Sequence, residues 1–224
     1  MRENVLDWEH LPWLHRETFA HVRLLERRRD GFHVETARRD AGFRAETARR
    51  DAVLSEAFEI DVAFEPDGLV YHSRTVAGRG AGTDIVTRLE PRGKGATAIV
   101  VEFLVPDAAA RHVERLRAAY LRLYTHLWDQ DEAMMIRRQA LLDAALRHEQ
   151  REVNVDGVLV RHSTVCPHRG GPLGDTVVED GCITCPWHGY RFDLLSGRSA
   201  DGRALRLERE VLGDAASPAR GRAR

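Results

Sequence analysis

Two segments near the end of the chain, CPHRGGPLG at 166–174 and CPWHGYRFDLLSGRS at 185–199, carry its most distinctive pattern. Each segment begins with Cys-Pro and contributes one cysteine and one histidine. The four residues are Cys166, His168, Cys185 and His188. Two thiolates and two imidazoles can hold a tetrahedral zinc ion, but a Cys-x-His pair is a poor zinc knuckle. The spacing instead favours a pair of irons, in which the two cysteines serve one iron and the two histidines serve the other.

These two segments resemble the cluster-binding loops of the Rieske [2Fe-2S] domain, and the resemblance implies that all four residues are cluster ligands. Rieske proteins of respiratory chains add a disulfide-forming cysteine to each loop. Here Trp187 stands between Cys185 and His188, which is similar to the lower-potential domains of oxygenases and their ferredoxins. Cys182 is expected to be a small buried strand residue. Its alternative roles are a substitute ligand or an oxidation-sensitive thiol.

A second pattern lies at the other end of the chain, where residues 3–15 read E-N-x-x-D-x-x-H-x-x-x-x-H. On a regular helix, residues five apart point about 140° away from each other, so His10 and His15 would not share a metal. Pro12 lies between them and tends to end or kink the helix before it. The sequence therefore predicts that His15 turns back toward His10.

This run resembles the iron-binding segment in the catalytic domain of Rieske non-haem iron oxygenases, which hydroxylate rings or remove methyl groups. That family takes a third ligand, an aspartate, from a late helix, and residues 128–139 resemble this helix. The resemblance implies Asp131 as the third ligand, with Asp129 and Glu132 as alternatives. Two histidines and one carboxylate leave one face of Fe(II) open for dioxygen and substrate.

The resemblance also implies a function and its components. Asp7 would accept a hydrogen bond from His10 and lie between the two iron sites, in a catalytic role. An external NAD(P)H-dependent reductase, directly or through a ferredoxin, would reduce the [2Fe-2S] cluster, which would pass one electron to a mononuclear Fe(II). The expected reaction is the O2-dependent hydroxylation or demethylation of a small apolar or aromatic substrate. Family members commonly pass the electron between neighbouring subunits of a ring, which suggests a homo-oligomer such as a trimer.

Two other functions stay open. The main alternative is a Rieske ferredoxin-like electron-transfer protein, whose first domain binds a hydrophobic ligand without activating oxygen. The other is a regulatory or redox-sensing role.

The hydrophobic pattern predicts an α+β chain. Six short segments with turn signals between them predict an antiparallel sheet: 20–25, 32–36, 58–64, 69–76, 83–89 and 97–105. Apolar residues at helical spacing then predict one long helix through about residue 148, with room for one break. A sheet followed by a long helix resembles the helix-grip scaffold of those oxygenases.

We expect the helix-grip domain, with the mononuclear iron, to span residues 1–148. A small all-β Rieske domain, opened by a hairpin around Asp156-Gly157, is expected over 149–212, and a disordered tail over 213–224. In the familiar oxygenases the Rieske domain comes first, whereas here it follows. A tandem duplication is also evident, since GFHVETARRDA at 31–41 and GFRAETARRDA at 42–52 agree at nine of eleven positions. One copy is expected to form an insertion or an extra hairpin.

Composition excludes several classes of function. The 34 Lys and Arg residues nearly balance the 35 Asp and Glu residues, for a net charge of -1, so no strong field favours nucleic acid or an anionic membrane. The longest nearly apolar run, 99–105, is too short to span a bilayer. The first residues are polar rather than an apolar signal region, and the three cysteines cannot form a disulfide framework. We therefore expect a cytoplasmic protein.

Overall fold

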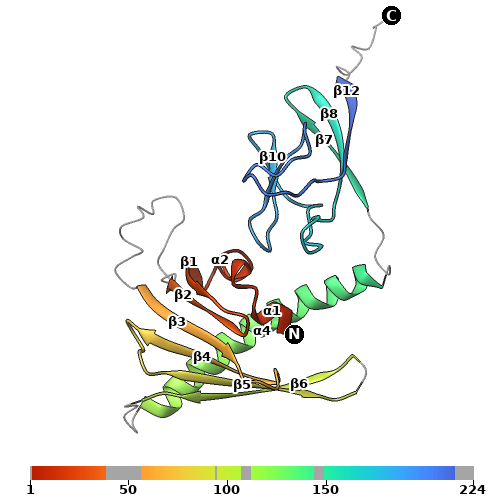
Figure 1. The fold of residues 1–224 in the computed structure, drawn as a ribbon. Helices are drawn as coiled ribbons and strands as arrows, with labels where there is room; N and C mark the ends of the chain where they lie inside the picture. The colour runs from red at the N-terminus through yellow and green to blue at the C-terminus, as the bar shows by residue number, and fades with distance from the viewer. Residues whose placement is uncertain (1, 39–56, 94, 107–111, 144–148, 215–224) are drawn as a thin grey trace, which may run out of the picture. The chain divides into compact units, whose positions relative to one another are not determined.

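The computed structural model of the chain describes residues 2–38, 57–93, 95–106, 112–143 and 149–214 (Figure 1). The chain divides into two compact units, Met1–Asp131 and Glu132–Arg224. The domain boundary predicted at residue 148, and the second copy of the duplicated segment at 42–52, lie outside the described residues. The first eight residues of the first copy, Gly31–Arg38, form a strand.

Three short helical turns open the first unit: α1 (Arg2–Val5), η1 (Trp8–His10) and α2 (Leu11–Leu14). A six-stranded sheet follows, in which every strand pairs antiparallel with the next along the chain. Its strands are β1 (Phe19–Arg27), β2 (Gly31–Arg38), β3 (Ala57–Phe64), β4 (Val70–Ala77), β5 (Asp84–Pro91) and β6 (Thr97–Leu104). Each strand begins and ends within two residues of its predicted bounds, so the predicted antiparallel sheet is confirmed.

One face of the sheet is apolar, because side chains alternate between the two faces along each strand. A buried cluster forms on this face, made of Phe32, Val34, Val62, Phe64, Tyr71 and Leu89. On the opposite face of the sheet, charged side chains pair across neighbouring strands. Arg23 donates to Glu35 at 2.8 Å, and Arg74 donates to Asp84 at 3.0 Å. The alternation therefore fixes which face of the sheet is covered.

Helix α4 (Val113–Leu142) is one continuous helix of 30 residues, without the break that the sequence left room for. Its first half contacts the end of the sheet, where the ring of Phe103 on β6 lies 4.8 Å from that of Tyr120 and 4.9 Å from that of Tyr124. One turn further along, Leu127 and Trp128 line a cavity together with residues of the apolar face. The helix thus covers the apolar face of the sheet (Figure 1).

The second unit contains two small antiparallel sheets, ordered β12-β8-β7 and β11-β10-β9. Their strands are β7 (Gln150–Val155), β8 (Val158–Ser163), β9 (Val178–Glu179), β10 (Cys182–Thr184), β11 (Arg191–Asp193) and β12 (Arg209–Asp214). The predicted hairpin is present, because Asp156 and Gly157 both adopt positive φ between β7 and β8. Strand β12 runs two residues into the segment expected to be a tail, since Gly213 and Asp214 pair with β8.

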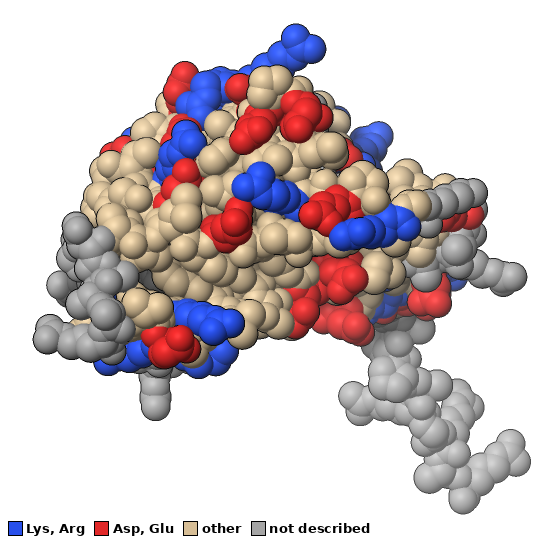
Figure 2. All heavy atoms as spheres, turned by 90° about the horizontal axis from the view of Figure 1, so that it is seen from below, with Lys and Arg blue, Asp and Glu red and all other residues tan. Residues whose placement is uncertain are grey.

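No helix in the described part of the chain is both long and apolar enough to cross a membrane. Acidic and basic side chains are interspersed on the face drawn in Figure 2. This pattern agrees with the near balance of charges in the composition.

Replacing Gly31 with alanine is expected to destabilise the first unit by about 2 kcal/mol. A Cβ at this position would lie 1.9 Å from the carbonyl oxygen of Val62, which is a backbone atom of the neighbouring strand. Gly174→Ala is the control, because its Cβ would lie 3.5 Å from a methyl of Thr164, an ordinary van der Waals distance. Urea denaturation followed by circular dichroism measures the difference, and equal midpoints for the two variants would contradict it.

Candidate metal centres

The two N-terminal histidines lie at the two ends of α2 (Leu11–Leu14). His10 ends the 3-10 turn η1, and His15 follows α2 with φ of -99° and ψ of 33°, outside the helical region. The sequence suggested that Pro12 ends or kinks the helix before it, but the structure shows a different position for this residue. It lies in the first turn of α2, where proline is tolerated because the first N–H groups of a helix have no partner within it. The chain stays helical from Trp8 to Leu14 and leaves the helical conformation only at His15. Both imidazoles are buried.

Helix α4 brings a carboxylate to these two histidines. The Asp131 Oδ1 atom lies 3.2 Å from His15 Nε2 and 3.5 Å from His10 Nε2. The candidate ligand atoms of all three residues lie within 4.8 Å of one another. The two alternatives for the third ligand, Asp129 and Glu132, are exposed. The structure therefore brings Asp131 to the histidines and neither of its rivals.

The neighbouring residue Gln130, to which the sequence analysis gave no role, orients His15. Its Oε1 atom lies 2.8 Å from Nδ1 of His15. Because an amide oxygen only accepts hydrogen bonds, Nδ1 carries the proton and donates it. In the neutral imidazole, Nε2 then presents a lone pair toward the Asp131 carboxylate.

This donor set fits a metal ion. A lone pair and a carboxylate oxygen that face each other repel unless a cation lies between them. Two imidazole nitrogens and one carboxylate oxygen form the set typical of non-haem Fe(II). A proton shared between His15 and Asp131 is the simplest other occupant of the same position.

Asp7 is buried, at 8% exposed. It precedes η1, and its backbone N–H donates to the carbonyl oxygen of Asn4 at 3.1 Å. The hydrogen bond expected between its carboxylate and His10 stays a prediction.

The two Cys-Pro loops of the second unit have the same backbone frame. In each loop the cysteine N–H bonds to the carbonyl oxygen five residues on, and the cysteine carbonyl accepts from the glycine four residues on, all at 2.9 Å. The glycines, Gly170 and Gly189, both have positive φ, which a residue without Cβ adopts at little cost. One local pattern thus presents Cys166 on one loop and Cys185 on the other.

The two cysteines face each other and are almost fully buried. Their hydrogen bond, together with His188 and backbone N–H groups, lowers the pKa of Cys185 to about 5. The same contact, together with burial, raises the pKa of Cys166. One thiol of the pair, that of Cys185, therefore ionises readily, and thiolate is the form that binds metal.

The backbone of Gly171, in the first loop, lies very close to the sulfur atom of Cys185 in the second loop. A Cβ on Gly171 would lie 2.5 Å from Sγ of Cys185 and 3.3 Å from the ring of Trp187. Only glycine therefore fits at this position. Sulfur, nitrogen and close backbone suit a small iron–sulfur cluster, so the residues present fit the group that the sequence implied.

The two histidines of these loops meet edge to face, with ring centroids 4.6 Å apart. His168 also stacks on Tyr190, at 4.3 Å between centroids and an angle of 22°. Arg203 lies over the Tyr190 ring at 3.9 Å and donates to its hydroxyl at 2.9 Å. Sequence reasoning assigned no role to Tyr190 or Arg203, although Tyr190 directly follows the second loop's glycine.

Cys182 is buried on β10, where it pairs with Asp193 and Glu179 in the sheet. It is not part of the group formed by the two loops. This placement matches the expected role of a small buried strand residue.

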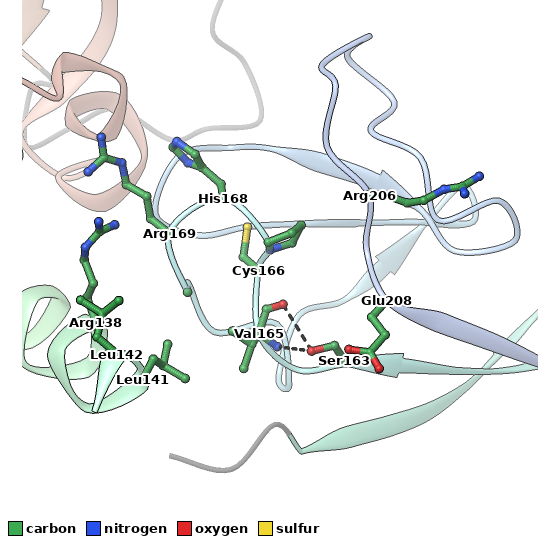
Figure 3. Close-up of a pocket in the computed structure, with 12 residues that line it drawn as sticks. Arg138, Leu141, Leu142, Ser163, Val165, Cys166, His168, Arg169, Arg206 and Glu208 are labelled. Atoms are coloured by element: carbon green, nitrogen blue, oxygen red, sulfur yellow. Dashed lines mark hydrogen bonds between the residues drawn. The ribbon is translucent and has the colours of Figure 1, made fainter. Parts of the chain in front are cut away.

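A pocket of about 450 Å³ within the second unit adjoins the first loop. Cys166 and His168 line it, so it reaches the proposed cluster ligands. Arg138 and Arg169 extend toward the same side of the pocket, and Arg206 lies on the other side (Figure 3). The pocket therefore combines access to an imidazole with positive charge.

Comparisons with known proteins agree with the geometry of the two loops. A curated relative, the oxygenase component of dicamba O-demethylase from Stenotrophomonas maltophilia, is 45% identical over 38 residues, which are 17% of this chain. That match spans 11% of the relative's own length. No solved structure matches the chain. The family model of the Rieske [2Fe-2S] domain matches residues 129–209, and this part of the chain is therefore a Rieske [2Fe-2S] domain.

Proposed function

We propose that the chain is a Rieske-type non-haem iron oxygenase, which hydroxylates or demethylates a small apolar substrate with dioxygen. The observation that carries the proposal is the convergence of His10, His15 and Asp131 within 4.8 Å, in a chain that also has a Rieske domain. An electron carrier would need the Rieske domain but has no use for a second donor set of this kind. The partial similarity to an oxygenase component supports the same reading.

Each donor set has a defined task in this proposal. When bound, the cluster supplies single electrons and the Fe(II) supplies the position at which dioxygen is activated. His10, His15 and Asp131 would hold the Fe(II). Gln130 keeps the proton of His15 on Nδ1, which leaves Nε2 free to bind metal. Residues of the sheet and of α4 line the adjoining cavity.

The scaffold and the partners belong to the same proposal. An antiparallel sheet covered by a long helix is consistent with a helix-grip catalytic domain. We expect a reductase, or a ferredoxin that it reduces, to dock where His168 lines the arginine-bearing pocket of the Rieske domain. Positive charge there would attract an acidic partner and raise its rate of association. A homo-oligomer such as a trimer, and a cytoplasmic location, remain expectations.

Iron content tests the proposal directly. Anaerobically reconstituted protein is expected to hold about three iron ions per chain, since a [2Fe-2S] cluster accounts for two of them. Asp131→Ala should lower this to about two and abolish substrate-dependent oxygen uptake, because the third ligand is lost. Iron analysis and an oxygen electrode measure the two effects.

The matched control is His126→Ala, which removes an exposed histidine from the same helix. It should keep both the third iron and the oxygen uptake. If wild-type protein holds only the two cluster irons, the proposal is wrong, and the protein is an electron carrier.

Gln130→Leu is expected to weaken Fe(II) binding by about tenfold or more, the usual cost of losing a hydrogen bond to a metal-binding histidine. Gln130→Glu keeps an acceptor for Nδ1 of His15 and should bind Fe(II) nearly as well as wild type. Gln139→Leu is the control on the same helix, because Gln139 bonds only to the exposed Asp143 in the described contacts. Calorimetric titration with Fe(II) measures these affinities, and an unchanged affinity in Gln130→Leu would contradict the role.

Serine substitutions separate the cluster ligands from the third cysteine. Cys185→Ser is expected to lose the visible absorption of the cluster, because the site needs a thiolate at this position. Cys182→Ser should keep the absorption, since Cys182 lies on β10 and outside the two loops. The opposite result would move the ligand role from Cys185 to Cys182.

A further inference from the structure

The cavity beside the candidate iron site limits what the first unit can bind. It measures about 140 Å³ and is lined by residues of α1, the N-terminal turns, β1, β2, β3, β4 and α4. Its apolar wall contains Val5, Leu11, Phe19, Phe32, Val34, Ile60, Val62 and Leu127. Its polar groups are Asn4, Ser73, Tyr71, His10, His15 and Asp131, with Tyr124 and Trp128 completing the lining.

The volume sets an upper limit on the ligand. A dry apolar protein cavity of roughly 150 Å³ accepts one benzene molecule. A cavity of about 140 Å³ therefore holds one six-membered ring with a small substituent. A fused two-ring molecule would require Ile60, Val34 or other wall residues to move, and packed interiors resist such movement.

The lining also discriminates against charged ligands. Among the described residues that line the cavity, none is Arg or Lys. In the iron-free protein Asp131 places a carboxylate on the wall, and a second carboxylate buried there would have no cationic partner to offset its loss of hydration. A ring that carries a carboxylate is therefore disfavoured.

One polar substituent can still be accommodated. Tyr71 lines the cavity, and burial raises its pKa to about 12. Its phenol thus keeps the proton at neutral pH and remains a hydrogen-bond donor. An ether or hydroxyl oxygen on the ligand would match this donor.

From this geometry we infer that the cavity binds a neutral molecule with a single six-membered ring, and excludes fused-ring and carboxylate-bearing molecules. The inference rests on the proposed function only in naming this molecule a substrate. The cavity itself is a property of the first unit, whether or not iron is held beside it.

Three probes of different size and charge test the inference. The full chain with its reconstituted cluster, kept anaerobic and without added Fe(II), is titrated calorimetrically with toluene, naphthalene and benzoate. Toluene should bind at least about tenfold more tightly than either of the others, because a small apolar pocket discriminates by this much against extra groups. Equal or tighter binding of naphthalene would overturn the size limit. Tight binding of benzoate to this protein without added Fe(II) would overturn the restriction to neutral ligands.

A pair of isoleucine variants separates the cavity from the stability of the core. Ile60 and Ile99 both pack against the same buried cluster, but of the two only Ile60 is among the residues that line the cavity. Ile60→Ala should enlarge the cavity and allow naphthalene to bind as tightly as toluene. Ile99→Ala should leave the preference for toluene unchanged. A shift in preference in Ile99→Ala, or none in Ile60→Ala, would show that this cavity does not set the limit.

The outcome is independent of the proposed reaction. If toluene binds with the expected selectivity but the iron-loaded protein takes up no oxygen, the oxygenase proposal fails and the cavity assignment stands. If oxygen uptake is found but toluene does not bind, the reaction stands and the substrate class is wrong.

Discussion

The packing of α4 across the apolar face of the sheet is the constraint on which the first unit depends. His15 and Gln130 are 115 residues apart in the chain, and only this packing brings them within 2.8 Å. The aromatic contacts of Phe103 with Tyr120 and Tyr124 hold the helix against β6. The same helix then presents Asp131 to both histidines and closes the cavity beside them. The same packing interaction therefore stabilises the fold of the first unit and brings the candidate metal ligands together.

Much of the fold could be predicted from the sequence, because its signals are local. Alternating residues and turn signals locate six strands to within two residues, and helical spacing locates α4. The effect of Pro12 was harder to predict, since a proline breaks a helix in its interior but is tolerated in its first turn. Which of these applies depends on where the helix begins, and here α2 begins at Leu11, so that Pro12 lies in its first turn.

The candidate sites could be predicted only in part, for a related reason. The four residues of the two Cys-Pro loops lie in short, recognisable segments, and a resemblance identified Asp131 among three nearby acids. Gln130 and Tyr190 act through contacts with side chains that no spacing rule connects to them. The residues that line the cavity are spread over four strands and four helical segments. Their arrangement becomes visible only in the folded chain.

The repeated backbone frame of the two Cys-Pro loops has a consequence for how such proteins evolve. Each loop is closed by its own backbone hydrogen bonds, and both lie within one short stretch of the gene. Such a stretch can be moved by recombination from one end of a coding sequence to the other with its ligands intact. The histidine and aspartate site has no such freedom, because it needs both ends of the first unit at once. A gene rearrangement that changes the order of the two parts therefore preserves both sites only if the cut falls between them.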